Sequence, residues 1–167
     1  MNLGKVQKII LLILTIGFTL FGIAFVVSVL FVERTTFNFR MLFPMALGVL
    51  GVFSTIFHIK TIEAYSVDFA SQFKFPKVPK LFWILNALNG FLILVIGLML
   101  SYFFYDSYDS EIRKQDDIEI FILVIAIPLI AGVWIALDIY KLFQMEQKVK
   151  EKQAFNSIDD ISGMDNK

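Results

Sequence analysis

The chain has 167 residues, no cysteine and no formal net charge, and 57% of its residues are hydrophobic, with a mean hydropathy of +0.73. The absence of cysteine excludes a disulfide framework, a thiol nucleophile and a cysteine metal site. Soluble domains are roughly 45–50% apolar, and the apolar residues here are concentrated in four long runs, so the composition indicates an integral membrane protein. An excess of Ile and Phe over Ala and Gly is typical of AT-rich genomes and favours a bacterial source.

Each of the four apolar runs is long enough to cross a bilayer, which takes about 20 residues. The first, at about residues 9–32, carries no charge. It is too long for the core of a signal peptide and is not followed by a cleavage site, so we expect a retained signal-anchor. The other spans are expected at about residues 41–59, 81–105 and 118–140.

The distribution of lysine and arginine predicts the orientation of these spans. Eleven of the fifteen cationic residues lie in the N-terminal segment, in the loop between the second and third spans, and in the C-terminal segment. Cytoplasmic loops carry such an excess. We therefore expect a multi-pass protein of the inner (plasma) membrane with both termini in the cytoplasm.

The segments outside the spans are too short for a core of their own. Apolar residues recur at helical spacing in the second loop, so we expect an amphipathic interfacial helix at about residues 61–73. Lys alternates with Glu and Gln over residues 141–155, which predicts a cytoplasmic helical extension whose excess of lysine suits anionic lipid headgroups. Residues 1–155 then form one transmembrane domain, and residues 156–167 a disordered tail.

Every span carries a stripe of small or polar residues at spacings of three and four, as in helices that pack closely in membranes. The stripes predict an all-α fold, an antiparallel bundle of four transmembrane helices. Residues 51–60 and 132–141 also align without gaps, from Gly-Val-aromatic to a final Lys. Two interpretations stay open: a tandem two-helix repeat, or a likeness shared by any apolar helix that ends in Lys.

Polar side chains within the runs form the candidate functional site. At about 1.5 Å of rise per residue, they gather in the cytoplasmic half of the membrane, while the outer half is apolar apart from Ser28 and Ser101. A pore through one monomer would need polar lining along its whole length, so the pattern favours a cytoplasm-facing vestibule. The candidate cluster consists of Thr15, Thr19, Thr55, His58, Asn86, Asn89 and Asp138.

Several roles are open for the most polar members of this cluster. Amides in hydrocarbon need partners, so Asn86 and Asn89 are expected to form hydrogen bonds between helices, with a ligand site or a partner's helix as alternatives. Asp138 is a functional candidate by default, or it pairs with Lys141 at i+3. His58 titrates near neutral pH, pairs with Asp138, or lies at the interface.

Signals of enzymatic or metal chemistry are missing from the sequence. It has no nucleophile elbow, no zinc-protease motif, no P-loop and no dinucleotide fingerprint. One His without Cys makes no metal site, and the acidic loop after the third span lacks the spacing and the Gly of a calcium loop. We therefore expect no catalytic residue, no cofactor, no metal and no nucleic-acid partner. A membrane enzyme using His58 and Asp138 is the least favoured hypothesis.

These features lead to two function hypotheses. The first is a small non-enzymatic accessory or regulatory protein, of the immunity type, that acts through helix–helix contacts with another membrane protein or with itself. The alternative is a small homo-oligomeric channel or transporter whose vestibule is the polar cluster. Under both hypotheses the protein is surrounded by the lipid bilayer.

Overall fold

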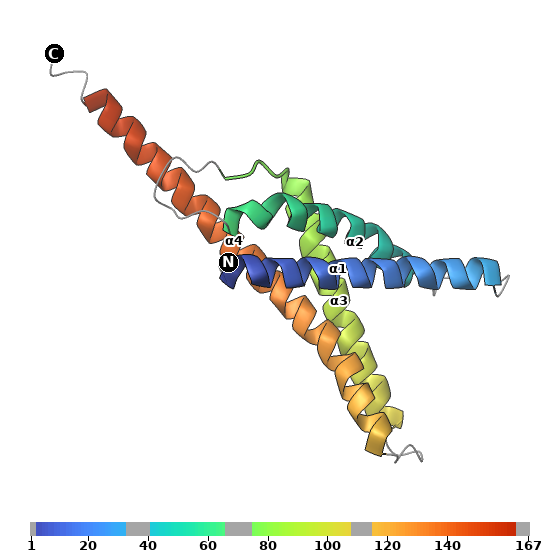
Figure 1. Cartoon of the computed structure of the whole chain (residues 1–167). Coiled ribbons are helices and arrows are strands. Elements are labelled where there is room, and N and C mark those ends of the chain that lie inside the picture. The colour runs from blue at the N-terminus through green and yellow to red at the C-terminus, as the bar shows by residue number, and fades with distance from the viewer. Residues whose placement is uncertain (1–2, 33–40, 66–74, 108–114, 163–167) are drawn as a thin grey trace.

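The computed structural model of the chain describes residues 3–32, 41–65, 75–107 and 115–162 (Figure 1). These residues form four long helices, so the expected all-helical class is confirmed. A π-helical turn, η1, continues the first helix, and a 3₁₀ turn, η3, continues the second. The elements are α1 (Leu3–Val27), η1 (Ser28–Val32), α2 (Leu42–Thr61), η3 (Ile62–Tyr65), α3 (Lys80–Ser107) and α4 (Gln115–Ser162).

Each long helix includes a stretch that is long and apolar enough to cross a membrane, by its length and composition. These stretches are Leu3–Phe31, Leu42–Tyr65, Lys80–Phe103 and Val124–Phe155. Their outward faces are rich in large apolar side chains, such as Phe21, Val49 and Phe91, which are more than half exposed. Apolar outward faces of this kind suit contact with lipid better than contact with water.

Two helix boundaries differ from those expected. α1 begins at Leu3, so Lys5 and Lys8 belong to the helix instead of flanking it. α4 passes through the expected extension at 141–155 without a break and ends at Ser162, so residues 156–162, assigned to a disordered tail, are helical. Of the expected interfacial helix at 61–73, the structure describes only its beginning, which includes η3; residues 66–74 lie outside the described part.

The four helices form two pairs. α1 lies beside α2 and α3 beside α4, and in each pair the chain runs out along one helix and returns along the other (Figure 1). The pairs meet mainly where α2 passes α3, with a shorter contact between α1 and α4. From this meeting place they diverge (Figure 1). An antiparallel bundle of all four helices about one axis stays a prediction.

Close backbone approaches hold each pair together. A Cβ atom on Gly22 of α1 would lie 2.8 Å from the carbonyl oxygen of Pro44 and 2.9 Å from the backbone nitrogen of Gly48, both in α2. In the other pair, a Cβ on Gly132 would lie 2.9 Å from the backbone nitrogen of Leu94. Small residues permit such approaches in apolar surroundings, where burying larger side chains gains little. Many residues of the small-residue stripes therefore pack against the other helix of the same pair.

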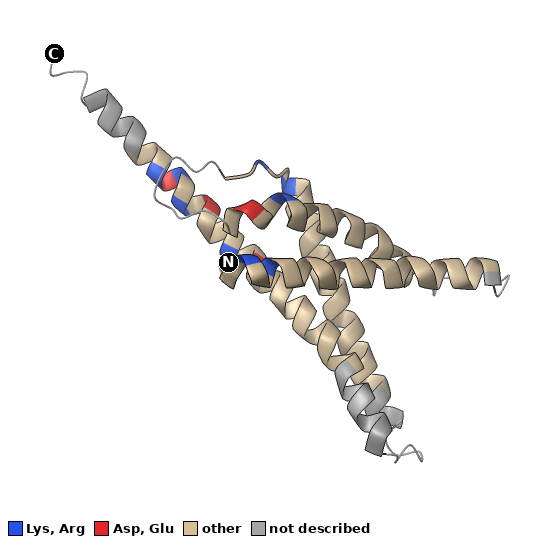
Figure 2. Cartoon of the chain, in the orientation of Figure 1, with Lys and Arg blue, Asp and Glu red and all other residues tan. Residues whose placement is uncertain are grey.

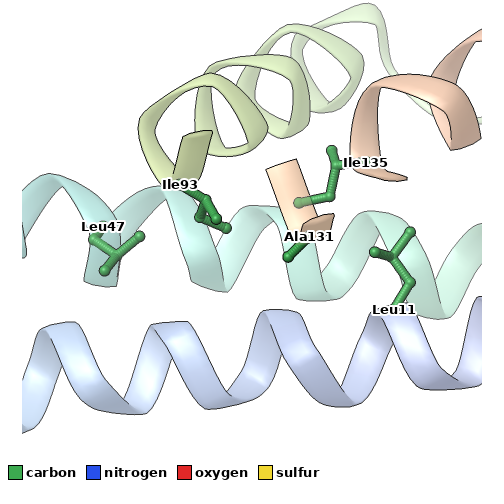
Figure 3. Close-up of a cluster of buried hydrophobic side chains, with 5 residues drawn as sticks. All are labelled: Leu11, Leu47, Ile93, Ala131 and Ile135. Atoms are coloured by element: carbon green, nitrogen blue, oxygen red, sulfur yellow. The ribbon is translucent and has the colours of Figure 1, made fainter. Parts of the chain in front are cut away.

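A cluster of buried apolar side chains joins the two pairs. It draws on all four helices, and Figure 3 shows the five side chains between the ribbons. Each of them is at most 1% exposed, so the place where the pairs meet has a closed core. The cluster consists of Leu11, Leu47, Ile93, Ala131 and Ile135.

Among the side chains that the structure describes, the charged ones gather at one end of the molecule. In Figure 2 they lie at the start of α1, at the end of α2, at the start of α3 and along the part of α4 that leads to the C-terminus. We call this region the lysine-rich end; among its cations are Lys5, Lys8, Lys60, Lys80 and Lys141. It is the end that the sequence predicts to face the cytoplasm.

Candidate functional site

An ion pair between the first and the last helix forms the centre of the site. Nζ of Lys8 in α1 lies 2.5 Å from Oδ2 of Asp138 in α4. Lys8 is 1% exposed and Asp138 is 6% exposed. Breaking a buried pair by removing one partner costs about 3–5 kcal/mol, because an uncompensated charge stays behind. The pair therefore fixes the start of α1 against α4.

Two further side chains approach the same carboxylate. The hydroxyl of Tyr65 in η3 donates a hydrogen bond of 2.8 Å to Oδ1 of Asp138. Nδ1 of His58 in α2 lies 3.7 Å from Oδ2. Tyr65 is 5% exposed and His58 is fully buried. Asp138 thus collects side chains from α1, α2 and η3, which together make up one helix pair and its extension.

Aromatic rings surround the ammonium group of Lys8. Its Nζ lies 5.2 Å from the ring centroid of Phe57 and 5.7 Å from that of Tyr65. A cation near aromatic rings is attracted by their quadrupoles, and more strongly where water is excluded. Phe57 and Tyr65 belong to a second buried apolar cluster, with Ala64 and Leu142. The Lys8 ammonium therefore lies against this cluster.

The expected pairing of Asp138 with Lys141 is wrong. Lys141 is exposed, and its Nζ lies 5.0 Å from the ring centroid of Tyr65. Lys8 takes the carboxylate instead, because the close packing of η3 and α4 around α1 brings it there although 130 residues separate the two in the chain. His58, in turn, is buried beside Asp138 and does not lie exposed at an interface.

Sequence reasoning missed Lys8 and Tyr65 as members of the site. The signal that could have identified them is the register of the stripes. Lys8 lies three residues before Leu11 on the buried face of α1, which continues through Thr15, Thr19 and Gly22. Tyr65 follows His58 and Thr61 at spacings of three and four. A lysine before an apolar run predicts orientation, but Lys8 also lies on the packed face of α1.

The two asparagines have different surroundings. The Ser54 hydroxyl of α2 donates a hydrogen bond to Oδ1 of Asn86 in α3, so Asn86 joins the two pairs. Neither polar atom of the Asn89 side chain has a hydrogen-bond partner within the described part of the chain, although the residue is 0% exposed. The described residues also offer no hydrogen-bond partner to Asn86 Nδ2, to Thr55 Oγ1 or to either ring nitrogen of His58.

The threonines of α1 satisfy their hydroxyls within their own helix. Thr15 Oγ1 donates to the carbonyl oxygen of Leu11 at 2.8 Å, and Thr19 Oγ1 donates to that of Thr15 at 2.7 Å. A Cβ on Gly51 of α2 would lie 2.9 Å from Cβ of Thr19, so Thr19 lines the contact between α1 and α2. Both threonines act in packing rather than as open ligands.

The arrangement thus has two parts. One is a buried ion-pair network of Lys8, Asp138, Tyr65 and His58 at the lysine-rich end. The other is a set of buried polar atoms without a hydrogen-bond partner among the described residues, on Asn86, Asn89 and Thr55. Across the described ranges, no group of three or more His, Cys, Asp or Glu residues could hold a metal ion.

Comparisons with known proteins returned no family model, no curated protein and no solved structure with significant similarity to this chain.

Proposed function

We propose that the protein is an integral membrane protein with both termini in the cytoplasm, whose four helices run antiparallel through the inner membrane. It acts without catalysis as an accessory or regulatory component, of the immunity type, by helix–helix contact with a different membrane protein. Four apolar helices support membrane insertion, and the excess of lysine at one end supports the orientation.

One observation carries the accessory role: an open apolar groove between α1 and the α3–α4 pair. The groove holds about 460 Å³, and residues of all three helices line it, among them Gly17, Phe18, Phe21, Leu100 and Pro128. A Cβ on Gly17 would meet nothing within 4 Å. Gly22, Gly48, Gly51, Gly90, Gly97 and Gly132, in contrast, are closed by a neighbouring helix. Gly17 is therefore a small-residue position at which a helix from another molecule can approach.

A transmembrane helix of a partner is the occupant that fits this groove. Apolar walls at membrane depth require an apolar occupant whose backbone hydrogen bonds are satisfied internally, and a helix meets that condition. A glycine at the contact lets two backbones approach closely. Ala24 is also exposed, two turns from Gly17 on the same face of α1, so the small-residue surface extends along the helix.

Photocrosslinking in native membranes tests this role. A photoreactive residue at Phe21, in the groove, is expected to give one discrete protein adduct, whereas the same residue at Val52, exposed on α2, is expected to give lipid adducts. Gly17→Trp should abolish the protein adduct, and Leu20→Trp, on the exposed side of the same helix, should keep it. A dimer of this chain, or lipid adducts at both positions, would contradict a partner helix.

The polar cluster favours a second candidate, a homo-oligomeric channel or transporter. Its support is the set of unpartnered atoms on Asn89, Thr55 and His58, which could contact a passing solute. The outer half of the spans, which is apolar apart from Ser28 and Ser101, argues against this candidate. Flux measurements on proteoliposomes separate the two: the accessory role predicts no flux, and flux that Asn89→Leu removes without loss of stability would establish the transporter instead.

A further inference from the structure

A small pocket opens where α1, η3 and α4 meet at the lysine-rich end. It holds about 220 Å³, and its lining includes Gln7, Lys8, Tyr65, Trp134, Asp138 and Lys141. It lies beside the buried ion-pair network but is distinct from the apolar groove, with which it shares no lining residue.

The charges around the pocket leave one cation in excess. Both oxygens of the Asp138 carboxylate are already engaged, Oδ2 with Lys8 and Oδ1 with the hydroxyl of Tyr65. Lys8 and Asp138 therefore neutralise each other. Lys141 is exposed, rests near the ring of Tyr65, and forms no ion pair with any carboxylate of the described residues. The pocket consequently offers a single uncompensated ammonium group to a ligand.

The depth of the pocket matches the level of lipid headgroups. On α1 the uninterrupted apolar run begins directly after Lys8, and on α4 the apolar residues give way to charged ones from Asp138 onward. Trp134 is half-buried in the lining, and aromatic rings of this kind favour the membrane interface. Leu137, also in the lining, is 60% exposed. The pocket thus continues onto an apolar surface against which acyl chains can lie.

We propose that this pocket binds the anionic phosphodiester headgroup of a membrane phospholipid, with Lys141 as the charged donor and the Gln7 amide as a second donor. Basic pockets between transmembrane helices on the cytoplasmic side bind anionic headgroups in this way. A single excess cation matches the single negative charge of a phosphodiester better than the higher charge of free phosphate. The inference rests on the proposed insertion in the membrane and adds a specific lipid ligand to it.

Native mass spectrometry of the full-length protein in a neutral detergent tests the site in the absence of the electrostatic potential of a membrane surface. Phosphatidylglycerol is titrated against phosphatidylcholine, which has the same phosphodiester but also a quaternary ammonium that cancels its charge and would be repelled by Lys141. We expect phosphatidylglycerol to bind the unsubstituted protein more tightly, and Lys141→Gln to weaken it about fivefold, the factor that corresponds to about 1 kcal/mol for one lysine at an anionic surface. Gln7→Leu should weaken it in the same direction.

Lys150→Gln is the matched control. Lys150 lies on the same helix outside the pocket, and its ammonium is already 2.7 Å from Glu146. It should bind phosphatidylglycerol like the unsubstituted protein; an equal loss in Lys141→Gln and Lys150→Gln would overturn the pocket in favour of diffuse surface charge. Glycerol phosphate that competes as well as the lipid would show a soluble ligand and overturn the lipid assignment.

Failure of this inference and failure of membrane insertion give different results. Protein that alkaline carbonate extracts from membranes would contradict insertion itself, and the lipid site with it. Protein that stays in the membrane pellet but binds phosphatidylglycerol and phosphatidylcholine equally would overturn the lipid site alone.

Discussion

Asp138 links the two helix pairs at the lysine-rich end, because its carboxylate accepts from Lys8 and Tyr65 and faces His58. In low-polarity surroundings such a carboxylate persists as a charge only when it is paired and hydrogen-bonded. The same surroundings make each partner dependent on the other. The contribution of Asp138 to the free energy of unfolding is therefore seen only when substitutions of Asp138 and of its partner are combined.

We predict that Lys8→Met and Asp138→Leu each destabilise the protein by about 3–5 kcal/mol, whereas the double variant stays within about 1 kcal/mol of the original or exceeds it. Each single change leaves one buried charge unpaired, and the double change leaves none. Unfolding in mixed micelles, followed by circular dichroism, measures the three free energies. A double variant as unstable as the sum of the singles would show that the pair is not coupled.

The asparagines should respond in opposite directions to replacement by leucine. Asn86→Leu removes the acceptor of the Ser54 hydroxyl and should cost about 0.6–1.7 kcal/mol, the range of such bonds between membrane helices. Asn89→Leu removes two unpartnered polar atoms and should be neutral or stabilising by about 1 kcal/mol. The same micelle assay compares them, with Ser54→Ala as the control for Asn86. A large loss in Asn89→Leu would reveal a bound water or ligand.

Individual residues also show which parts of the site could be predicted from the sequence. That Asp138 needs a partner follows from its place in an apolar run, but the choice of partner does not. Lys141, at i+3, is near in the sequence, while Lys8 is near in space because η3 and α4 pack around the start of α1. Tertiary packing selects Lys8, which local spacing does not indicate, over Lys141, which it does.

At the scale of helices, glycine determines how closely the members of each pair approach. Gly51 of α2 contacts Thr19 of α1, and Gly132 of α4 contacts Leu94 of α3. These two glycines begin the aligned segments 51–60 and 132–141, and each faces the first helix of its own pair. Gly17 and Gly90, each followed by Phe in the sequence, differ from each other: Gly17 is open, and a Cβ on Gly90 would meet Ile135. The tandem two-helix repeat stays a prediction.

Alanine substitution separates the closed glycines from the open one. Gly22→Ala should destabilise the protein by about 1–3 kcal/mol, because the added methyl group meets the backbone of α2. Gly17→Ala should leave stability unchanged or raise it by up to about 1 kcal/mol, since alanine has the higher helix propensity and the space is empty. Thermal unfolding in detergent ranks the two variants. Equal losses would mean that Gly17 is covered within the molecule.

At the scale of the whole molecule, two helix pairs meet in a core drawn from all four helices and diverge beyond it (Figures 1 and 3). The number and class of the helices could be predicted, because an apolar run of about 20 residues is a strong signal by itself. Their divergence could not, because the crossing of the pairs depends on which side chains interlock where α2 passes α3. That crossing forms the apolar groove. The stripes of small residues alone therefore do not predict it.

The proposed orientation can be tested in a chain that has no cysteine of its own. Single cysteines at Lys5 and Lys150 should react with a membrane-impermeant maleimide only after the inner membrane is opened, and a cysteine at Asp109, outside the described residues, should react in intact spheroplasts. The reason is that lysine-rich segments stay in the cytoplasm. Labelling of Asp109→Cys from the cytoplasmic side alone would overturn the orientation.

The separation of 130 residues between Lys8 and Asp138 has a consequence for biosynthesis. Lys8 is synthesised well before Asp138, which follows only with α4. In the proposed membrane insertion the ammonium group must stay in water or at the headgroups until then, because an unpaired charge in hydrocarbon is costly. A nascent chain that stops before α4 therefore leaves α1 unanchored at its charged end. In the proposed membrane insertion, the synthesis of α4 is the event that fixes the charged end of the first helix.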